Sequence, residues 1–320
     1  MSRTKFFVNN SIAMAIQQLV NVAVAFILPR FLITAYGSEV NGLIVSITQF
    51  ISYFILVEAG ISGASVYALY KPLADKNIES INSILAASRK FYLQSGYIFV
   101  ILTAILAFSY HFIAGSLYLS DIQIAIIVFC TGSSGAMDFF TLSKYRVLLT
   151  ADQKSHIISV AAIVSSIIKI ILVIIFSIYR LDVVWLQIFL LLSVFSRSII
   201  LWFYTRRHYA YLNFEVKPDY QAIKDRWNVL YLQLLGSAQG AAPIIIATIF
   251  TSLYQVSVYS IYNMIIGGIN SILSIFISGL AASFGDVIAK NETKILQKSH
   301  QEFESFYYIV ITIVYSVALL

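Results

Sequence analysis

The chain has 320 residues, of which 59% are hydrophobic and only 11% are charged. A soluble globular domain carries about 25% charged residues, so this composition excludes water as the main solvent of the fold. The net charge of +6 would suit a nucleic-acid partner, but the basic residues fall in short clusters between apolar runs, which indicates membrane topology and no nucleic acid. The single cysteine, Cys130, excludes an intrachain disulfide and a cysteine metal site.

Nine apolar segments follow one another along the chain, and most are long enough to cross a bilayer. A hydrocarbon core about 30 Å thick needs roughly 20 apolar residues per helix, and a backbone in lipid must satisfy its own hydrogen bonds. The long runs therefore predict helices rather than barrel strands. We expect an all-α fold, a polytopic transmembrane helix bundle. The segments cover residues 9–34, 40–69, 91–113, 121–143, 157–178, 182–204, 228–252, 256–287 and 306–320.

The distribution of Lys and Arg predicts the orientation of this bundle. Short cytoplasmic loops carry the excess of these residues. Most of the 21 in this chain fall at one end of the bundle if the N-terminus is inside, whereas the opposite connections hold only Arg180. We therefore expect a multi-pass protein of the cytoplasmic membrane whose N-terminus is cytoplasmic.

Helices seven and eight resemble helices one and two, which predicts an internal repeat. Gln233 corresponds to Gln17, 216 residues earlier, and the run from Val256 can be laid over the run from Ser38, 218 residues earlier. The alternative is that any two amphipathic membrane helices look alike. A six-helix repeat would give both halves the same orientation, and the second half would need three helices beyond residue 320. The expected domains are an N-terminal six-helix bundle at 1–208, a cytoplasmic linker at 209–227 and the first three helices of a C-terminal bundle at 228–320.

Three successive helices each carry one charge inside an apolar run, at Asp138, Lys169 and Arg197. A charge at the centre of a membrane helix costs about 2.5 to 3.5 kcal/mol, so it faces a partner or water rather than lipid. Helical spacing places small and polar residues on the same face as each charge, among them Ser165 beside Lys169. This pattern predicts a hydrated central cavity whose net charge of +1 favours an anion. The alternative is that Asp138 forms a structural ion pair with Lys169 or Arg197.

Other side chains are candidates for the same cavity. Arg30 follows Pro29 near the outer end of helix one, where it either lines the cavity or extends to lipid head groups. Glu58 is a candidate for binding a coupling ion or for pairing with a neighbouring helix. The polar side chains expected to line the cavity are Gln17, Asn21, Ser165, Gln233 and Asn263.

Three stretches resemble a known family. They are residues 36–82, beginning YGSEVNGLIVSITQF, residues 148–157, LLTADQKSHI, and residues 256–291, beginning VSVYSIYNMIIGGIN. They are similar to the polysaccharide-biosynthesis flippases of the multidrug/oligosaccharidyl-lipid/polysaccharide superfamily. No catalytic signature is part of this likeness, which rests on its length.

The resemblance implies two bundles of six helices around a cavity that opens alternately to the two sides of a bacterial cytoplasmic membrane. The implied cargo is a lipid-linked oligosaccharide, and other polysaccharide-assembly proteins are implied partners. Arg30, Lys169 and Arg197 would supply the cationic lining. Glu58 and Asp138 would be candidates for coupling to H⁺ or Na⁺, and no cofactor or bound metal is expected.

Other functions compete with this interpretation. A peptidoglycan-precursor flippase or a cation-coupled exporter of the MATE type would have the same architecture. A membrane glycan polymerase or ligase would need a sizeable outer loop with catalytic side chains, and the outer connections here offer only Glu39, Asp121, Arg180 and Asp182. Soluble-enzyme motifs such as H-E-x-x-H and G-x-S-x-G do not occur in the sequence, so we expect no enzyme activity.

Overall fold

The computed structural model describes residues 3–113, 119–223, 240, 242–268 and 270, together with isolated residues between 297 and 316. The chain forms two compact units, Met1–Ser260 and Ile261–Leu320, and each is treated by itself.

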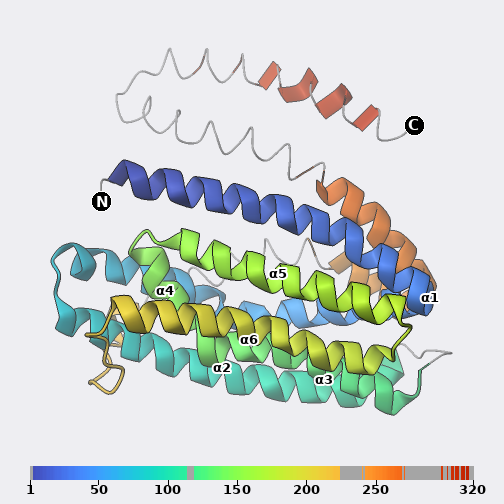
Figure 1. The fold of residues 1–320 in the computed structure, drawn as a ribbon, viewed down its shortest axis with the longest axis horizontal. Helices are drawn as coiled ribbons and strands as arrows, with labels where there is room; N and C mark the ends of the chain where they lie inside the picture. The colour runs from blue at the N-terminus through green and yellow to red at the C-terminus, as the bar shows by residue number, and fades with distance from the viewer. Residues whose placement is uncertain are drawn as a thin grey trace. The chain divides into compact units, whose positions relative to one another are not determined.

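The first unit is a bundle of long helices joined by short turns (Figure 1). No strand occurs among the described residues, and five helices there are long and apolar enough to cross a membrane, which confirms the predicted all-α transmembrane bundle. Residues 242–250 and 253–268 are also helical. The other elements are α1 (Arg3–Ala74), α2 (Ile78–Ile113), α3 (Asp121–Met137), the π-helix η1 (Asp138–Leu142), α4 (Ser143–Ala151), α5 (Ser155–Ile178), α6 (Val183–His208) and the 3-10 helix η2 (Gln221–Ile223).

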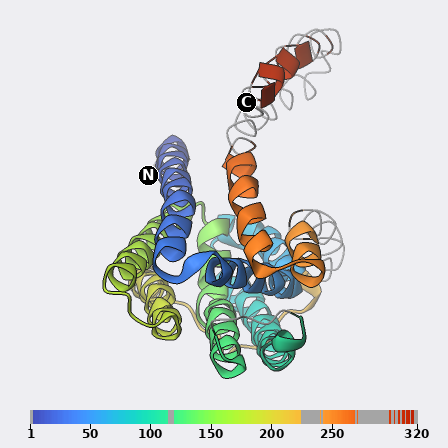
Figure 2. The ribbon, with the colours of Figure 1, turned by 90° about the vertical axis from the view of Figure 1, so that its right-hand side faces the viewer.

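The element α1 contains two membrane spans rather than one. Gly37 interrupts it with φ 86° and ψ 164°, a backbone conformation that glycine adopts easily. The hydroxyl of Tyr36 donates a hydrogen bond of 2.8 Å to the carbonyl of Leu181, between α5 and α6. At the opposite ends of these helices, the amide of Asn10 donates a 2.8 Å hydrogen bond to the carbonyl of Gln153. The first part of α1 thus spans the bundle, and the chain bends sharply before the second part (Figure 2).

Several helices extend beyond the apolar runs from which they were predicted. The turn between α1 and α2 is only residues 75–77, although a polar connection was expected from 70 to 90. The polar side chains of this stretch find partners that keep it helical. The Ser88 hydroxyl donates to the hydroxyl of Ser65 at 2.8 Å, and the Asn82 amide donates to the carbonyl of Tyr211 at 3.1 Å.

The fourth predicted helix runs without a break from residue 121 to residue 151 but changes its hydrogen-bonding pattern in the middle. Ser120 and Gln123 form a reciprocal capping box at its start. At the end of η1 the backbone N–H of Ser143 reaches the carbonyl of Asp138, five residues earlier. Such π-helical turns are rare and are frequent at functional sites.

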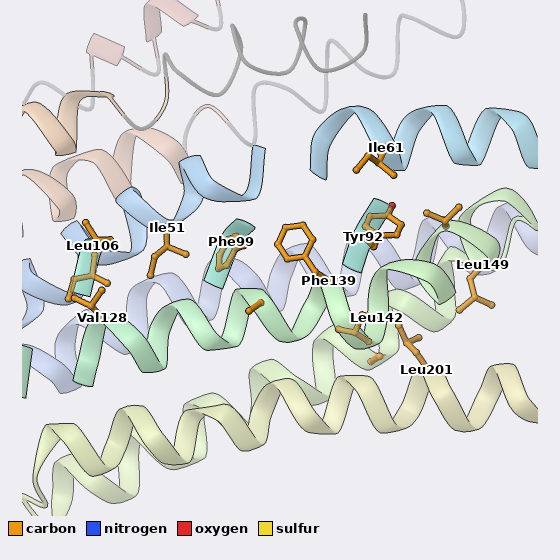
Figure 3. Close-up of a cluster of buried hydrophobic side chains, with 14 of the residues drawn as sticks. Ile51, Ile61, Tyr92, Phe99, Leu106, Val128, Phe139, Leu142, Leu149 and Leu201 are labelled. Atoms are coloured by element: carbon orange, nitrogen blue, oxygen red, sulfur yellow. The ribbon is translucent and has the colours of Figure 1, made fainter. Parts of the chain in front are cut away.

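The α2 helix illustrates the two environments of the bundle. Tyr110 is fully buried in the core, as are Tyr92 and Phe99 (Figure 3), and the core also includes residues of α1, α3, α4 and α6. On another face Phe108 and Phe112 are 79% and 77% exposed. An apolar face this extensive is unfavourable in water and is what a helix presents to lipid tails.

The second part of α1 packs closely against residues 242–257, which include the two helical stretches on either side of residues 251 and 252. The amide of Asn41 donates a buried 2.8 Å hydrogen bond to the hydroxyl of Ser257, 216 residues later, and Thr248 donates to Ser46 at the same distance. A Cβ atom at Gly42 would lie 1.8 Å from the carbonyl oxygen of Leu253. Only glycine allows the two backbones to approach this closely.

At the end of the bundle that carries the N-terminus, Tyr209 joins the turns after α4 and α6. The ammonium of Lys154 lies 2.9 Å from the Asp152 carboxylate and donates to the Tyr209 hydroxyl at 3.0 Å, and this hydroxyl donates to the same carboxylate. Burial raises the pKa of Tyr209, and its hydrogen bond to the negative Asp152 carboxylate raises that pKa further. The hydroxyl therefore remains a donor at neutral pH.

The second unit contains one of the predicted cavity residues. Residues 261–268 are helical, and Asn263 among them is exposed. Gln233, expected in helix seven, lies outside the described residues. The domain boundaries at 208 and 228 stay a prediction.

The close approach at Gly42 predicts that its replacement by alanine destabilises the protein. Because the added Cβ would overlap the Leu253 carbonyl, we expect Gly42→Ala to lower the unfolding free energy by about 1 to 3 kcal/mol, measured as a lower thermal midpoint in detergent. Gly240→Ala is the matched control, since a Cβ there meets no atom within 4 Å. Equal midpoints for the two variants would contradict the packing argument.

The expected orientation places the turn after α1 and the turn after α5 on opposite sides of the membrane, so reagents outside the cell should reach only one of them. With the buried Cys130 replaced by serine, Asp75→Cys introduces a thiol in the turn after α1, and Tyr179→Cys introduces one after α5. If the N-terminus is cytoplasmic, a membrane-impermeant maleimide should label Tyr179→Cys in intact cells and Asp75→Cys only after permeabilisation. The reverse pattern would mean the opposite orientation.

Candidate functional site

A cavity of about 360 Å³ lies inside the first unit between α1, α3, α5 and α6. Its lining contains apolar side chains, such as Leu32 and Val173, as well as polar and charged ones. All three charges predicted from the apolar runs reach this cavity, as does Ser165. The polar lining includes Thr131, Ser134, Asp138, Ser165, Lys169 and Arg197.

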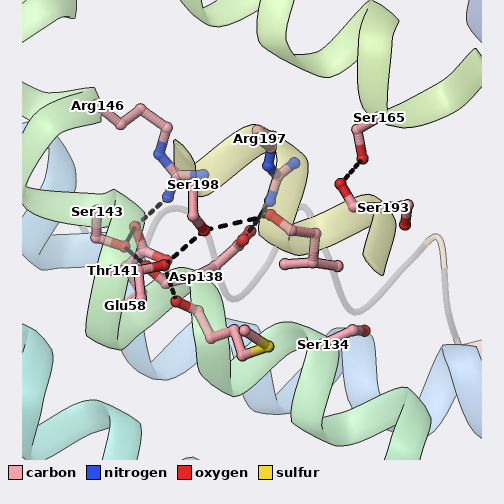
Figure 4. Close-up of polar contacts among 12 residues, drawn as sticks. Glu58, Ser134, Asp138, Thr141, Ser143, Arg146, Ser165, Ser193, Arg197 and Ser198 are labelled. Atoms are coloured by element: carbon pink, nitrogen blue, oxygen red, sulfur yellow. Dashed lines mark hydrogen bonds and ion pairs between the residues drawn. The ribbon is translucent and has the colours of Figure 1, made fainter. Parts of the chain in front are cut away.

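Asp138 and Arg197 form an ion pair at one side of the cavity (Figure 4). Both carboxylate oxygens of Asp138, the first residue of η1, accept hydrogen bonds from Nη2 of Arg197 in α6. The ion pair that the sequence left as an alternative is therefore present. The Nε of Arg197 is buried and has no hydrogen-bond partner, so the guanidinium keeps one donor unused.

Lys169 is the cavity cation that has no acidic partner in the described part of the chain. It lies in α5, its side chain is exposed to the cavity, and no ion pair or hydrogen bond of its ammonium is formed with a described residue. Because Asp138 already neutralises Arg197, Lys169 gives the lining a net positive charge. The two cations of this cavity thus differ: Arg197 is paired with Asp138, whereas Lys169 is available to a ligand.

The hydroxyl groups around these charges donate hydrogen bonds to backbone carbonyls of the bundle. Ser165 of α5 donates a 2.7 Å hydrogen bond to the carbonyl of Ser193 in α6. Thr131 and Ser134 donate to carbonyls of their own helix at 2.8 and 2.6 Å. Their oxygens can still accept hydrogen bonds, so this wall suits water or the hydroxyls of a polar ligand.

A second ion pair lies beside the cavity but does not line it. Glu58, only 5% exposed in the second part of α1, pairs with Arg146 of α4. Ser143 connects this pair to the first, because its hydroxyl lies 3.5 Å from Glu58 Oε1 and 3.0 Å from the carbonyl of Asp138 (Figure 4). The two pairs thus flank η1.

Sequence reasoning did not identify Arg146. The predicted helix ended at residue 143, which assigned Arg146 to a cytoplasmic loop, and the structure corrects this because the helix continues to Ala151. The available signal was Glu58, a buried acid that required a cation from a neighbouring helix.

Three other predicted residues do not line this cavity. Arg30 and Asn21 are exposed, and Gln17 is half-buried, all in the first part of α1. The position of Arg30 agrees with the alternative that it extends to lipid head groups. Nowhere in the described residues do three His, Cys, Asp or Glu side chains gather as metal ligands would.

The described helices thus form a transmembrane bundle with a cavity that polar and charged side chains line. No protein-family model and no curated protein matches the chain. Its fold matches a solved structure, the inward-facing conformation of a multidrug resistance MATE family transporter of the MOP superfamily, with a TM-score of 0.70 and 19% identity over 98% of this chain and 72% of that one. The expected fold of this superfamily is thereby confirmed.

The Glu58–Arg146 pair predicts a pattern of stability in single and double variants. Arg146→Met would leave a buried carboxylate without its partner, which costs about 3 to 5 kcal/mol. We expect a large drop in the thermal midpoint in detergent and recovery of most of it when Glu58→Gln is added. Arg180→Gln, in an exposed turn, should change little. Failure of Glu58→Gln to restore the midpoint would show that the pair is not what stabilises this region.

Proposed function

We propose that this chain is a membrane transporter that moves a lipid-linked oligosaccharide from the cytoplasmic to the outer leaflet of a bacterial cytoplasmic membrane. Its N-terminus is cytoplasmic in this proposal, and other polysaccharide-assembly proteins are its expected partners. The observation that supports it is the net positive lining of the cavity. A polyprenyl-pyrophosphate glycan has an anionic head and many hydroxyls, which match a cation next to a row of serine and threonine side chains.

The charges of the cavity explain how such a head group is bound without being held permanently. Lys169 offers an ammonium that no acid among the described residues neutralises. The Asp138 carboxylate beside Arg197 limits the total positive charge. A moderate net charge lets an anion enter the cavity and also leave it, which transport requires.

Flipping requires no covalent bond to be broken. The charged head group follows a hydrated cationic path, while the polyprenyl tail stays in lipid. The hydrogen bonds of Asn41 and Ser46 to residues 248–257 would have to break for the cavity to open on that side of the bundle. Their hydroxyl and amide groups can exchange these partners for water at little cost.

A cation-coupled exporter of the MATE type is the second candidate. The similar solved structure is a multidrug resistance transporter of that family. In this case Asp138 and Glu58 would bind H⁺ or Na⁺ in exchange for the arginines that neutralise them, and the cargo would be a drug-like cation. The same ion coupling is compatible with a flippase, so the sign of the cargo's charge distinguishes the two. A peptidoglycan-precursor flippase would share the anionic head group, and defined glycolipids separate it from an oligosaccharide flippase.

Lys169→Gln tests the proposed anion site. We expect transfer of a polyprenyl-pyrophosphate oligosaccharide across proteoliposome membranes to slow by about tenfold or more, because a hydrogen bond to a charged group contributes about 1.5 to 3 kcal/mol. In cells, export of surface polysaccharide should fall in parallel. Lys76→Gln, in the exposed turn after α1, is the control that removes an equal charge outside the cavity.

The same proteoliposomes separate the two candidates. A flippase should transfer the glycolipid and show no efflux of a cationic dye driven by a proton or sodium gradient. Unchanged glycolipid transfer in Lys169→Gln would refute the anion site, and gradient-driven dye efflux without glycolipid transfer would favour the exporter.

A further inference from the structure

A second pocket, of about 320 Å³, lies on the outside of the first unit between α4 and α6. Phe140, Thr141, Lys144 and Tyr145 line it from one side, and Ser198, Ile199 and Trp202 line it from the other. It shares no lining residue with the central cavity. The hydroxyls of Thr141 and Ser198, 2.8 Å apart, form a polar part of its wall.

Lys144 lines this pocket, and a second cation, Arg89, lies close to Lys144 without lining the pocket itself. The ammonium of Lys144 lies 4.9 Å from the ring centroid of Tyr145 and 5.0 Å from that of Phe214. The guanidinium of Arg89, from α2, lies 5.8 Å from the same Phe214 ring. Neither cation forms an ion pair with any acid in the described ranges. Two like charges that share an aromatic ring repel each other, so an anion that binds between them is favoured.

An exposed apolar stripe on α6 leads to this pocket. Leu192, Phe195 and Ile199 are 51%, 47% and 61% exposed, and their spacing of three and four residues places them on one helix face. Trp202, three residues further on, is 44% exposed and lines the pocket itself. An apolar stripe that ends in a tryptophan and a pair of cations matches the shape of a lipid, with chains along the helix and a phosphate at its end.

We propose that the pocket between α4 and α6 binds the phosphate of a membrane lipid through Lys144, with Arg89 adding positive charge nearby and the acyl or prenyl chain along Leu192, Phe195 and Ile199. A lysine that only extends to the water layer would point away from the helix bundle. Lys144 instead points its ammonium at two aromatic rings beside a second cation. The proposal is independent of transport, because the site lies outside the central cavity.

Trp202 makes the pocket directly observable. The chain has three tryptophans, so the replacements Trp185→Phe and Trp227→Phe leave Trp202 as the only tryptophan of the full chain. Reconstitution with phosphatidylglycerol brominated on its chains should quench Trp202 more strongly than brominated phosphatidylcholine does. We expect Lys144→Gln to reduce the preference for the anionic lipid by about fivefold, the effect of one basic side chain near a membrane surface.

Two control variants keep the test decisive. Lys144→Arg preserves the charge and should preserve the preference, which separates a loss of charge from a loss of folding. Lys90→Gln removes a neighbouring exposed cation of α2 that lies over Tyr220 and does not line the pocket. It should leave the preference unchanged. Equal quenching by both lipids in the starting protein, or an undiminished preference in Lys144→Gln, would overturn the proposal.

A competition experiment identifies the source of the phosphate. Unbrominated polyprenyl phosphate is added to the vesicles that contain brominated phosphatidylglycerol. If the fluorescence of Trp202 recovers, the pocket binds the phosphate of a carrier lipid. If the quenching persists, its ligand is the phospholipid of the bilayer. Transport assays are not needed for either result, so failure of this proposal and failure of the proposed function can be told apart.

Discussion

A charged side chain inside a bilayer must have a partner or face water, and the centre of this bundle is arranged around that requirement. Asp138 neutralises Arg197 between η1 and α6, and Glu58 neutralises Arg146 between α1 and α4. Each pair therefore connects helices that are distant in the chain. Removing one member would expose the other to an apolar surrounding, whereas together they are stable. Lys169 has no such partner among the described residues, and it faces the cavity.

The π-helical segment η1 makes both pairs possible in a single continuous helix. It begins at Asp138 and is followed directly by Ser143, which contacts Glu58 and the Asp138 carbonyl. One extra residue in a helical turn rotates everything beyond it by roughly 100° relative to an ordinary α-helix. Arg146 thereby pairs with α1 while Asp138 pairs with α6. A change between the two hydrogen-bonding patterns at η1 would rotate Arg146 relative to Asp138 and so change how the two ion pairs are placed relative to each other.

The bundle offers two different positive sites. The central cavity combines Lys169 with serine and threonine hydroxyls beside apolar side chains, and its polar part suits a hydrated head group. The outer pocket combines Lys144, and Arg89 close to it, with aromatic rings and an apolar stripe, which suits a lipid that stays in the membrane. The difference follows from their surroundings, since the same cation binds a hydrated anion in a polar cavity and a lipid phosphate at the membrane surface.

The sequence by itself determined that the chain folds in a membrane and that its spans are helices, because apolar runs of about 20 residues have only one stable form in a bilayer. It also determined which charges lie at the centre, because charges within such runs are few. Asp138, Lys169 and Arg197 were found in this way, and the structure brings them to one cavity. Only the tertiary structure decided which charges are paired, that Arg30 lies outside the cavity, and that Arg146 belongs to a helix. Helical spacing gives the face of a residue but not the helix opposite, and the π-turn at η1 shifts the register that such counting assumes. The partner of a charge is set by packing between helices, which no single segment contains.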